Sequence, residues 1–227
     1  MKILFVNPNS SALITNILRK EAEKYAGENL IIDVTACADV PTAIETRYDE
    51  LLAGSQVVKL LQDMQGEYDG AVIGCFADPG LSAARDLLGI PVVGLYESSS
   101  FFAKFHGGGY SIIASGDYRD ISAWHGSIRA IGDSQNVTSI RCLNSTVEDA
   151  AGESDEKICK LIERCKVEDG AEAIILGCAA FAGRGAKLSA MMDIPVIDGI
   201  EESIRIIEML CKYRRKEESC GKGNTMD

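Results

Sequence analysis

The chain contains the stretch GAVIGCF at residues 70–76 and a matching stretch, AIILGCA, at residues 173–179. Each begins with a short apolar run typical of a strand buried on both faces of a parallel sheet, and each continues with Gly-Cys. An Ile-Pro-Val segment follows both copies. The repeat therefore places one thiol, Cys75 or Cys178, at the end of each of two equivalent strands.

Strands and helices alternate along the rest of the chain. Apolar runs typical of strands occupy residues 2–6, 30–36, 70–74, 91–95, 110–115, 137–142, 173–177 and 195–197. Apolar residues at helical spacing predict helices at residues 13–25, 48–64, 81–88, 118–131, 155–166 and 201–213. This alternation predicts an α/β fold with parallel sheets covered on both faces, as one domain or as two small lobes.

The ends of the repeated strands are the natural place for a ligand. In open parallel sheets, ligands bind at the carboxyl ends of the strands, which is where both Gly-Cys pairs lie. Two thiols on either side of a cleft suit one kind of chemistry. They can remove a proton from one face of a carbon and return a proton to the opposite face.

Composition and charge exclude several other classes of protein. The chain has 227 residues and a formal net charge of −11, which argues against binding to nucleic acid or to an anionic membrane surface. No apolar run approaches a transmembrane span. The first residues are soon broken by Pro8 and read as a strand rather than a signal peptide. We therefore expect a cytoplasmic protein.

The eight cysteines do not form a recognisable metal or disulfide framework. Disulfides are rare in the cytoplasm, and the chain has no Cys-x-x-Cys pair and only two histidines. Cys159 and Cys165 are six residues apart on a predicted helix, which does not place them on one face. Neither a Gly-x-Gly-x-x-Gly fingerprint nor a Walker loop is present, so no metal and no nucleotide cofactor are expected.

The loop after the first strand, Asn-Pro-Asn-Ser-Ser at residues 7–11, has two interpretations. The simpler one is a loop in which Ser10 or Ser11 caps the following helix. The functional one adds that the asparagine amides and the helix N-terminus face the same crevice as the thiols and hold a carbonyl or an anion there. Residues 7–11 alone favour the simpler interpretation.

The loop after the first Gly-Cys pair carries a helix-start signal. Asp78 is placed to cap a helix whose first residue is Pro79. Such a helix N-terminus would lower the pKa of the Cys75 thiol. A single free cysteine is usually a small core residue, but two cysteines in repeated contexts at strand ends favour a chemical role.

Taken together, these segments resemble the hydantoin racemase branch of the aspartate/glutamate racemase superfamily. The resemblance extends from Met1 to about Leu210, with its motifs in the same order and spacing. The motifs that carry it are at residues 7–10, 44–50, 75–85, 172–179 and 194–199.

The resemblance implies two pseudo-symmetric, Rossmann-like lobes with the active site in the cleft between them. The first lobe would comprise residues 1–96 with 198–227, including a disordered polar tail from about residue 212, and the second lobe residues 97–197. It also implies racemisation without a cofactor, with Cys75 and Cys178 as the acid/base groups, and association into a homo-oligomer. The expected substrate contacts are Asn9, Ser10, Phe76, Ser115, Gly116, Ala179 and Phe181.

Departures from the family pattern concern the substrate. The segment Ala114-Ser115-Gly116 stands where relatives commonly have paired threonines. Phe181 lies in the segment after the second Gly-Cys pair, which also differs from the family pattern. Phe76 and Phe181 favour an alkyl or aryl substituent at C5 of a hydantoin. The alternatives are allantoin, an aspartate- or glutamate-type amino acid, and a non-catalytic small-molecule-binding protein of the same fold.

Overall fold

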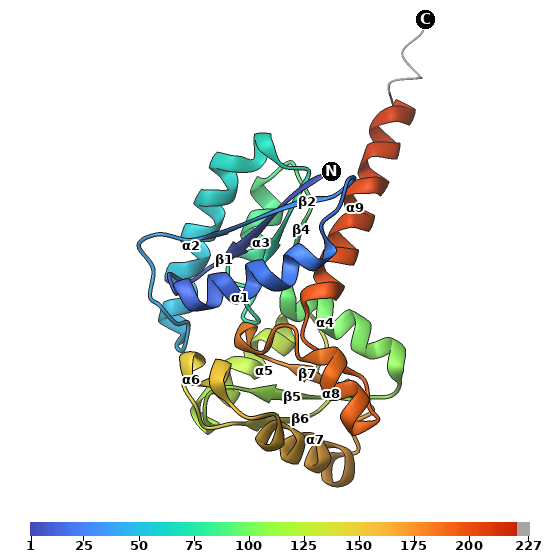
Figure 1. Cartoon of the computed structure of the whole chain (residues 1–227). Helices are drawn as coiled ribbons and strands as arrows, with labels where there is room; N and C mark the ends of the chain where they lie inside the picture. The colour runs from blue at the N-terminus through green and yellow to red at the C-terminus, as the bar shows by residue number, and fades with distance from the viewer. Residues whose placement is uncertain (222–227) are drawn as a thin grey trace, which may run out of the picture.

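The computed structural model describes residues 1–221, which form two four-stranded sheets of parallel strands (Figure 1). The first sheet has the order β2-β1-β3-β4, with β1 at Lys2–Asn7, β2 at Ile31–Ala36, β3 at Gly70–Ile73 and β4 at Val92–Gly94. The second has the order β6-β5-β7-β8, with β5 at Tyr110–Ala114, β6 at Val137–Cys142, β7 at Ala173–Leu176 and β8 at Val196–Ile197. The predicted α/β fold is confirmed, and the two sheets repeat one topology.

The repeated strands β3 and β7 occupy the same position in their sheets. All four residues of each strand are buried, as expected for a strand covered on both faces. Val6 pairs with Ile73 in the first sheet, and Ile113 pairs with Leu176 in the second. The loops after β1 and β3 therefore emerge side by side, and so do the loops after β5 and β7.

Helices cover both sheets. They are α1 at Ala12–Ala22, α2 at Arg47–Met64, α3 at Leu81–Leu87, α4 at Leu95–Ala103, α5 at Ile121–Ala130, α6 at Val147–Gly152, α7 at Asp155–Asp169, α8 at Gly185–Met192 and α9 at Ile200–Gly221. Short 3-10 turns lie at Glu23–Tyr25, Gln65–Glu67, Lys104–His106, Tyr118–Asp120 and Ala179–Phe181. None of the helices within residues 1–221 combines the length and the apolar composition that crossing a membrane requires.

Three helices, α4, α6 and α8, were not predicted from the sequence. The predicted strand at residues 91–95 ended at Leu95, which is instead the first residue of α4. The residue before α4 is Gly94, whose missing side chain cannot cap the helix. The first backbone N–H groups of α4 are bound by Asp78, a residue from another loop, which a local pattern does not reveal.

Asp78 caps α4 and not α3, so the predicted role of the Asp78-Pro79 pair is wrong. Helix α3 begins only at Leu81, after Gly80, whose φ of +78° lies in the left-handed region that favours glycine. The Asp78 carboxylate accepts hydrogen bonds from the backbone N–H groups of Tyr96 at 3.1 Å and Glu97 at 2.9 Å. Burial raises the pKa of this carboxyl group to about 7.

The last helix is longer than the sequence predicted. A disordered tail was expected from about residue 212, but α9 continues to Gly221, and residues 222–227 lie outside the described part of the chain. The Arg215 guanidinium binds the Asp69 carboxylate at 2.7 Å, and the Cys211 thiol donates to the Asp69 carbonyl at 3.2 Å. These contacts hold α9 beside the first sheet, as Figure 1 shows.

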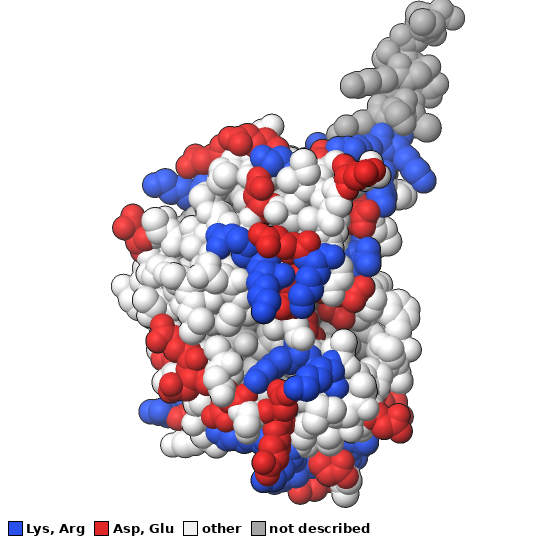
Figure 2. Space-filling model, viewed as in Figure 1, with Lys and Arg blue, Asp and Glu red and all other residues white. Residues whose placement is uncertain are grey.

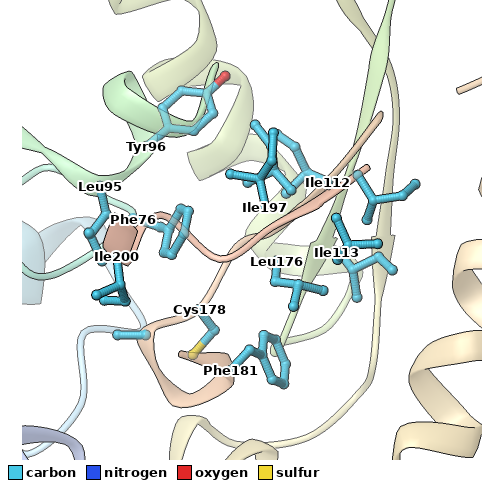
Figure 3. Close-up of a cluster of buried hydrophobic side chains, with 14 of the residues drawn as sticks. Phe76, Leu95, Tyr96, Ile112, Ile113, Leu176, Cys178, Phe181, Ile197 and Ile200 are labelled. Atoms are coloured by element: carbon cyan, nitrogen blue, oxygen red, sulfur yellow. The ribbon is translucent and has the colours of Figure 1, made fainter. Parts of the chain in front are cut away.

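One continuous apolar core joins the two sheets. Figure 3 shows Phe76, Leu95 and Ile200 facing the same interior as Ile112, Leu176 and Ile197 of the second sheet. A second cluster, which includes Leu4, Val57 and Leu61, fills the space between the first sheet and α2. The two sheets therefore form one packed body.

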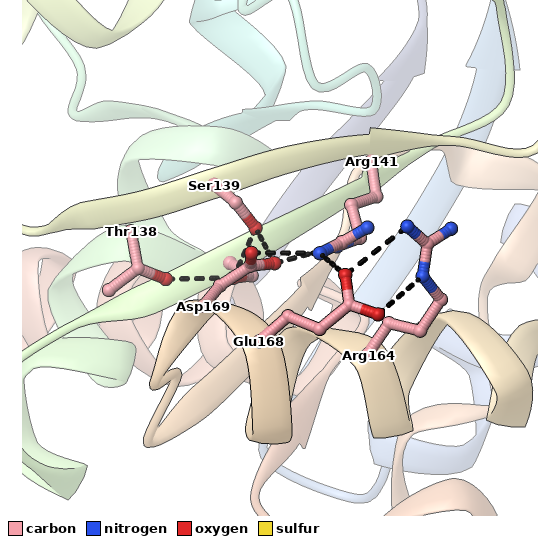
Figure 4. Close-up of polar contacts among 7 residues, drawn as sticks. Thr138, Ser139, Arg141, Arg164, Glu168 and Asp169 are labelled. Atoms are coloured by element: carbon pink, nitrogen blue, oxygen red, sulfur yellow. Dashed lines mark hydrogen bonds and ion pairs between the residues drawn. The ribbon is translucent and has the colours of Figure 1, made fainter.

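A polar network fixes the outer edge of the second sheet (Figure 4). Arg141 of β6 donates to Asp169 at 2.6 Å and to Glu168 at 2.6 Å, at the C-terminal end of α7. Ser139 also donates to Asp169 at 2.6 Å. This network ties β6 to α7. Strand β6 lies on the opposite side of β5 from β7.

The buried carboxyl of Asp78 predicts how stability depends on pH. Its folded-state pKa is raised to about 7, from an ordinary value of 3.8. Below the ordinary pKa, the carboxyl group makes its full contribution to the free energy of unfolding. Between the two pKa values the unfolded chain releases the proton and the folded chain keeps it, so this contribution is lost as pH rises through the folded-state pKa. Urea unfolding should therefore show wild type losing stability relative to Asp78→Asn between about pH 5 and about pH 7.5.

The matched control is Asp86→Asn, which changes an exposed carboxylate on α3. Its stability difference from wild type should stay nearly constant over the same range. A constant difference for Asp78→Asn as well would contradict the raised pKa of Asp78.

Candidate active site

A cavity of about 870 Å³ opens where the strands of both sheets end. The loops after the two central strands of each sheet contribute to its wall. These loops supply Asn9 after β1, Cys75 after β3, Ser115 after β5 and Cys178 after β7. Both repeated cysteines therefore line the same cavity, although they come from different sheets.

Glycine is required before each of these cysteines. A Cβ atom on Gly74 would lie 2.7 Å from the ring of Phe5, and a Cβ atom on Gly177 would lie 2.6 Å from the ring of Trp124. Both separations are well inside van der Waals contact, so a side chain at either position would displace a ring of the wall or core. The Gly-Cys pair therefore has the same physical reason in both sheets. Each strand end leaves no room for a side chain at the glycine, while the cysteine that follows lines the cavity.

The two thiols have matching backbone partners. The backbone N–H of Ala77 points at the Cys75 sulfur over 3.5 Å. At the other thiol, the backbone N–H of Ala180, also two residues further along the chain, lowers the pKa of Cys178. Burial outweighs both interactions, because it raises the pKa of Cys75 to about 12 and also raises the pKa of Cys178.

The prediction that a helix N-terminus lowers the pKa of Cys75 is therefore wrong. The helix on which it relied does not begin until Leu81, and the thiol lies in a largely enclosed wall where its charged form is poorly solvated. The raised pKa values of both thiols favour their protonated forms at neutral pH.

Ser115 makes the two thiol environments unequal. Its side chain is buried in the wall, and its hydroxyl lowers the pKa of Cys178 by hydrogen bonding to the sulfur. The strand register places Ser115 of the second sheet at the position that Pro8 has in the first. Since proline carries no hydroxyl, this position stabilises a thiolate at Cys178 and not at Cys75.

Asn9 lines the cavity but Ser10 does not. The Asn9 side-chain oxygen accepts hydrogen bonds from the Asn7 amide at 2.8 Å and the Ser11 backbone N–H at 3.0 Å, so its amide NH₂ is the group it can offer a ligand. Ser10 is exposed and donates to the Val40 carbonyl at 2.9 Å. Ser11, not Ser10, caps α1.

The other expected contacts divide in the same way. Phe76, Gly116 and Ala179 belong to the cavity wall. Phe181 is fully buried and lies behind Cys178 in the apolar core, as Figure 3 shows. Because Phe181 is not part of the wall, it shapes the cavity only through the residues that it supports.

The segment between β2 and α2 lines the cavity and reaches across it to α5. Residues 44–50 supply wall residues, although the sequence pattern assigned them no contact. The Arg47 guanidinium donates to the Ala123 carbonyl of α5 at 2.9 Å and pairs with Glu50 at 2.7 Å. This bridge holds the two sides of the opening together beside Gly126, where a Cβ atom would meet the Arg47 side chain.

Two further wall segments were missed from the sequence, at residues 117–127 and 144–149. They follow β5 and β6, so their position after the carboxyl ends of strands was the available signal. Within residues 1–221, no group of three or more His, Cys, Asp or Glu side chains is arranged to hold a metal ion.

The inequality of the thiols predicts an effect of Ser115→Ala. Removing the hydroxyl takes a hydrogen bond from the Cys178 thiolate and should raise the pKa of that thiol. At about pH 8, alkylation of Cys178 by iodoacetamide should slow by roughly three- to tenfold, since only the thiolate reacts. Peptide mass spectrometry would follow Cys178 and Cys75 separately.

Ser122→Ala is the matched control, because it removes another hydroxyl of the same wall. Equal slowing at Cys75 and Cys178 in the Ser115 variant would point to a general change of the cavity. It would contradict a specific interaction with Cys178.

Comparison with known proteins identifies the family of this chain. The family model described as "Asp/Glu/Hydantoin racemase" matches residues 3–207. A hydantoin racemase from Paenarthrobacter aurescens is 34% identical over 218 residues, which cover 92% of this chain and 91% of that protein.

Solved structures extend the likeness to three dimensions. An allantoin racemase from Klebsiella pneumoniae has a TM-score of 0.89 and 27% identity, covering 94% of this chain and 88% of that chain. An allantoin racemase from Pseudomonas fluorescens has a TM-score of 0.87 and 26% identity, covering 94% and 92%. With nearly the whole chain matched by the family model, the protein belongs to the Asp/Glu/hydantoin racemase family.

Proposed function

We propose that this protein is a cofactor-independent racemase that inverts C5 of 5-substituted hydantoins, with Cys75 and Cys178 as its two acid/base groups. The observation that carries the proposal is the presence of both thiols in one cavity wall, at equivalent ends of two equivalent strands. The names of the relatives, hydantoin racemase and allantoin racemase, support this substrate class.

The chemistry needs no more than two well-placed proton carriers. The C5 hydrogen of a hydantoin lies beside a ring carbonyl, so its removal gives an enolate delocalised into the ring. One cysteine removes this proton as a thiolate, and the other delivers a proton to the opposite face as a thiol. The two cysteines exchange roles for the other enantiomer.

The unequal environments of the thiols suit this division of roles. A racemase of this kind needs one thiolate and one thiol at the same time. Ser115 and the Ala180 N–H favour ionisation of Cys178, and the charge on Cys178 in turn raises the pKa of Cys75. Once Cys178 has lost its proton, its negative charge therefore favours the protonated form of Cys75.

Backbone and amide N–H groups are available for the enolate. Ala77, whose N–H lies beside the Cys75 sulfur, lines the cavity, and Asn9 offers its amide NH₂ from the neighbouring loop. Fixed donors in a partly enclosed cavity stabilise developing negative charge more than water does.

Allantoin is the second candidate substrate. The expectation of an apolar C5 substituent relied on Phe76 and Phe181, but only Phe76 belongs to the wall. The solved structures named above are allantoin racemases, and allantoin is itself a hydantoin with a polar ureido substituent at C5. Incubating enantiopure allantoin and benzylhydantoin side by side, and following optical rotation, would rank the two.

Single-cysteine variants test the two-thiol mechanism. Cys75→Ala and Cys178→Ala should each reduce racemisation by at least about a hundredfold, because either loss removes the acid or the base. Each variant should still exchange C5–H for deuterium in one enantiomer only, and the two variants should act on opposite enantiomers. Proton NMR in D₂O measures the exchange, and optical rotation measures the inversion.

Cys159→Ala, which removes a half-buried thiol of α7, is the control and should keep normal activity. Racemisation by either single variant at close to the wild-type rate would exclude the two-thiol mechanism. If the wild-type protein binds hydantoins but does not exchange their C5–H, it is a non-catalytic small-molecule-binding protein.

The raised thiol pKa values predict the pH profile. Burial raises the pKa of both cysteines, so the thiolate base is scarce at neutral pH and increases as pH rises. The value of kcat/KM should therefore rise about tenfold per pH unit from about pH 7 to about pH 9. Initial rates at low substrate concentration would give the profile, and a flat profile in this range would contradict a thiol base.

A further inference from the structure

The cavity wall is rich in carboxylates. It includes five carboxylate side chains and two guanidinium groups: Glu45, Glu50, Asp117, Asp120, Asp149, Arg47 and Arg119. Both guanidinium groups are held by carboxylates of the same wall, Arg47 by Glu50 at 2.7 Å and Arg119 by Asp117 at 2.6 Å. The wall therefore offers a ligand an excess of negative charge.

Two of these carboxylates share the cavity wall with both thiols and act on them electrostatically. Glu45 and Glu50 come from the segment at residues 44–50 that reaches across the opening. The charge of Glu45 acts on Cys178, where it raises the thiol pKa, and the charge of Glu50 acts on Cys75 in the same direction. The Arg47–Ala123 bridge fixes this segment over the cavity.

A hydantoin ring occupies only a small part of a cavity of about 870 Å³. With C5 between the two sulfur atoms, the C5 substituent extends into the remaining space, which residues 44–50 border. An ionised carboxylate can only accept hydrogen bonds, so these residues complement a substituent that donates them. A carboxylate on the substituent would face side chains of the same charge in the cavity wall.

We propose that Glu45 and Glu50 determine the specificity of this site, which takes hydantoins whose C5 substituent donates hydrogen bonds or carries positive charge and rejects those with a carboxylate. This inference rests on the proposed function, because it assumes that the ring binds between the thiols. It also sets the protein apart from a racemase of aspartate or glutamate, whose substrates carry a side-chain carboxylate.

Three hydantoins that differ little in size separate these effects. They carry at C5 the side chain of glutamate, glutamine or lysine, which is respectively anionic, neutral with an NH₂ donor, and cationic. Isothermal titration calorimetry gives the Kd of each, and optical rotation gives its kcat/KM. The glutamine and lysine forms should bind at least about tenfold more tightly than the glutamate form.

The Glu45→Gln variant tests the residue directly. It removes the charge but keeps the size, and it should narrow the glutamate-to-glutamine ratio of Kd by roughly three- to fivefold, as expected for an exposed charge. Glu45→Asp keeps the charge and should keep most of the discrimination. Raising the salt concentration to about 1 M should also narrow the ratio, because it screens the repulsion.

Glu50→Gln should narrow the same ratio, although it also releases Arg47 from its ion pair. The matched control is Glu156→Gln, which removes an exposed carboxylate of α7 outside the cavity wall. It should leave the ratio unchanged.

The outcomes for selectivity and for function are separable. Equal Kd values for the three hydantoins, or tightest binding of the glutamate form, would overturn the charge selection even if all three are racemised. Charge-selective binding without loss of optical rotation would refute the proposed racemase activity and leave the selection standing. Binding of none of the three would overturn the charge selection, and the assay with allantoin and benzylhydantoin would then decide the proposed racemase activity separately.

Discussion

The structure depends on the burial of two short parallel strands, β3 and β7, at equivalent positions of two sheets. Each strand is covered on both faces, and each is followed by a glycine packed against an aromatic ring, Phe5 or Trp124. This crowding fixes where the chain leaves the sheet. The cysteine that follows each glycine therefore lines the same cavity, one from each sheet.

The cavity combines the symmetry of the two sheets with one departure from it. The strand order and the i+2 backbone N–H at each sulfur are shared by both lobes. Ser115 stands where the first lobe has Pro8, and it gives one thiol an additional hydrogen-bond donor. A racemase needs symmetry to serve both faces of a carbon, and it needs inequality so that only one of two buried thiols ionises.

Sequence patterns were reliable where local physics decides the structure and failed where distant contacts do. All eight strands were expected, because an apolar run bounded by glycine or proline is a local signal. Helix α4 was missed because its cap, Asp78, comes from another loop, and α9 was ended too early because its anchor at Asp69 is remote in sequence. The sequence predicted a lowered pKa for Cys75, but its pKa is raised. The cause is burial, which depends on how the two sheets pack against each other.

The sequence by itself determined the α/β fold, the internal repeat and the pair of cysteines, since buried strands and Gly-Cys turns leave a direct record in the order of residues. Tertiary structure alone decided which side chains face the cavity. It placed Phe181 in the core and Ser10 at the surface, and it brought Glu45 and Glu50 across the opening. These placements depend on how two sheets pack against each other, and no local pattern encodes that arrangement.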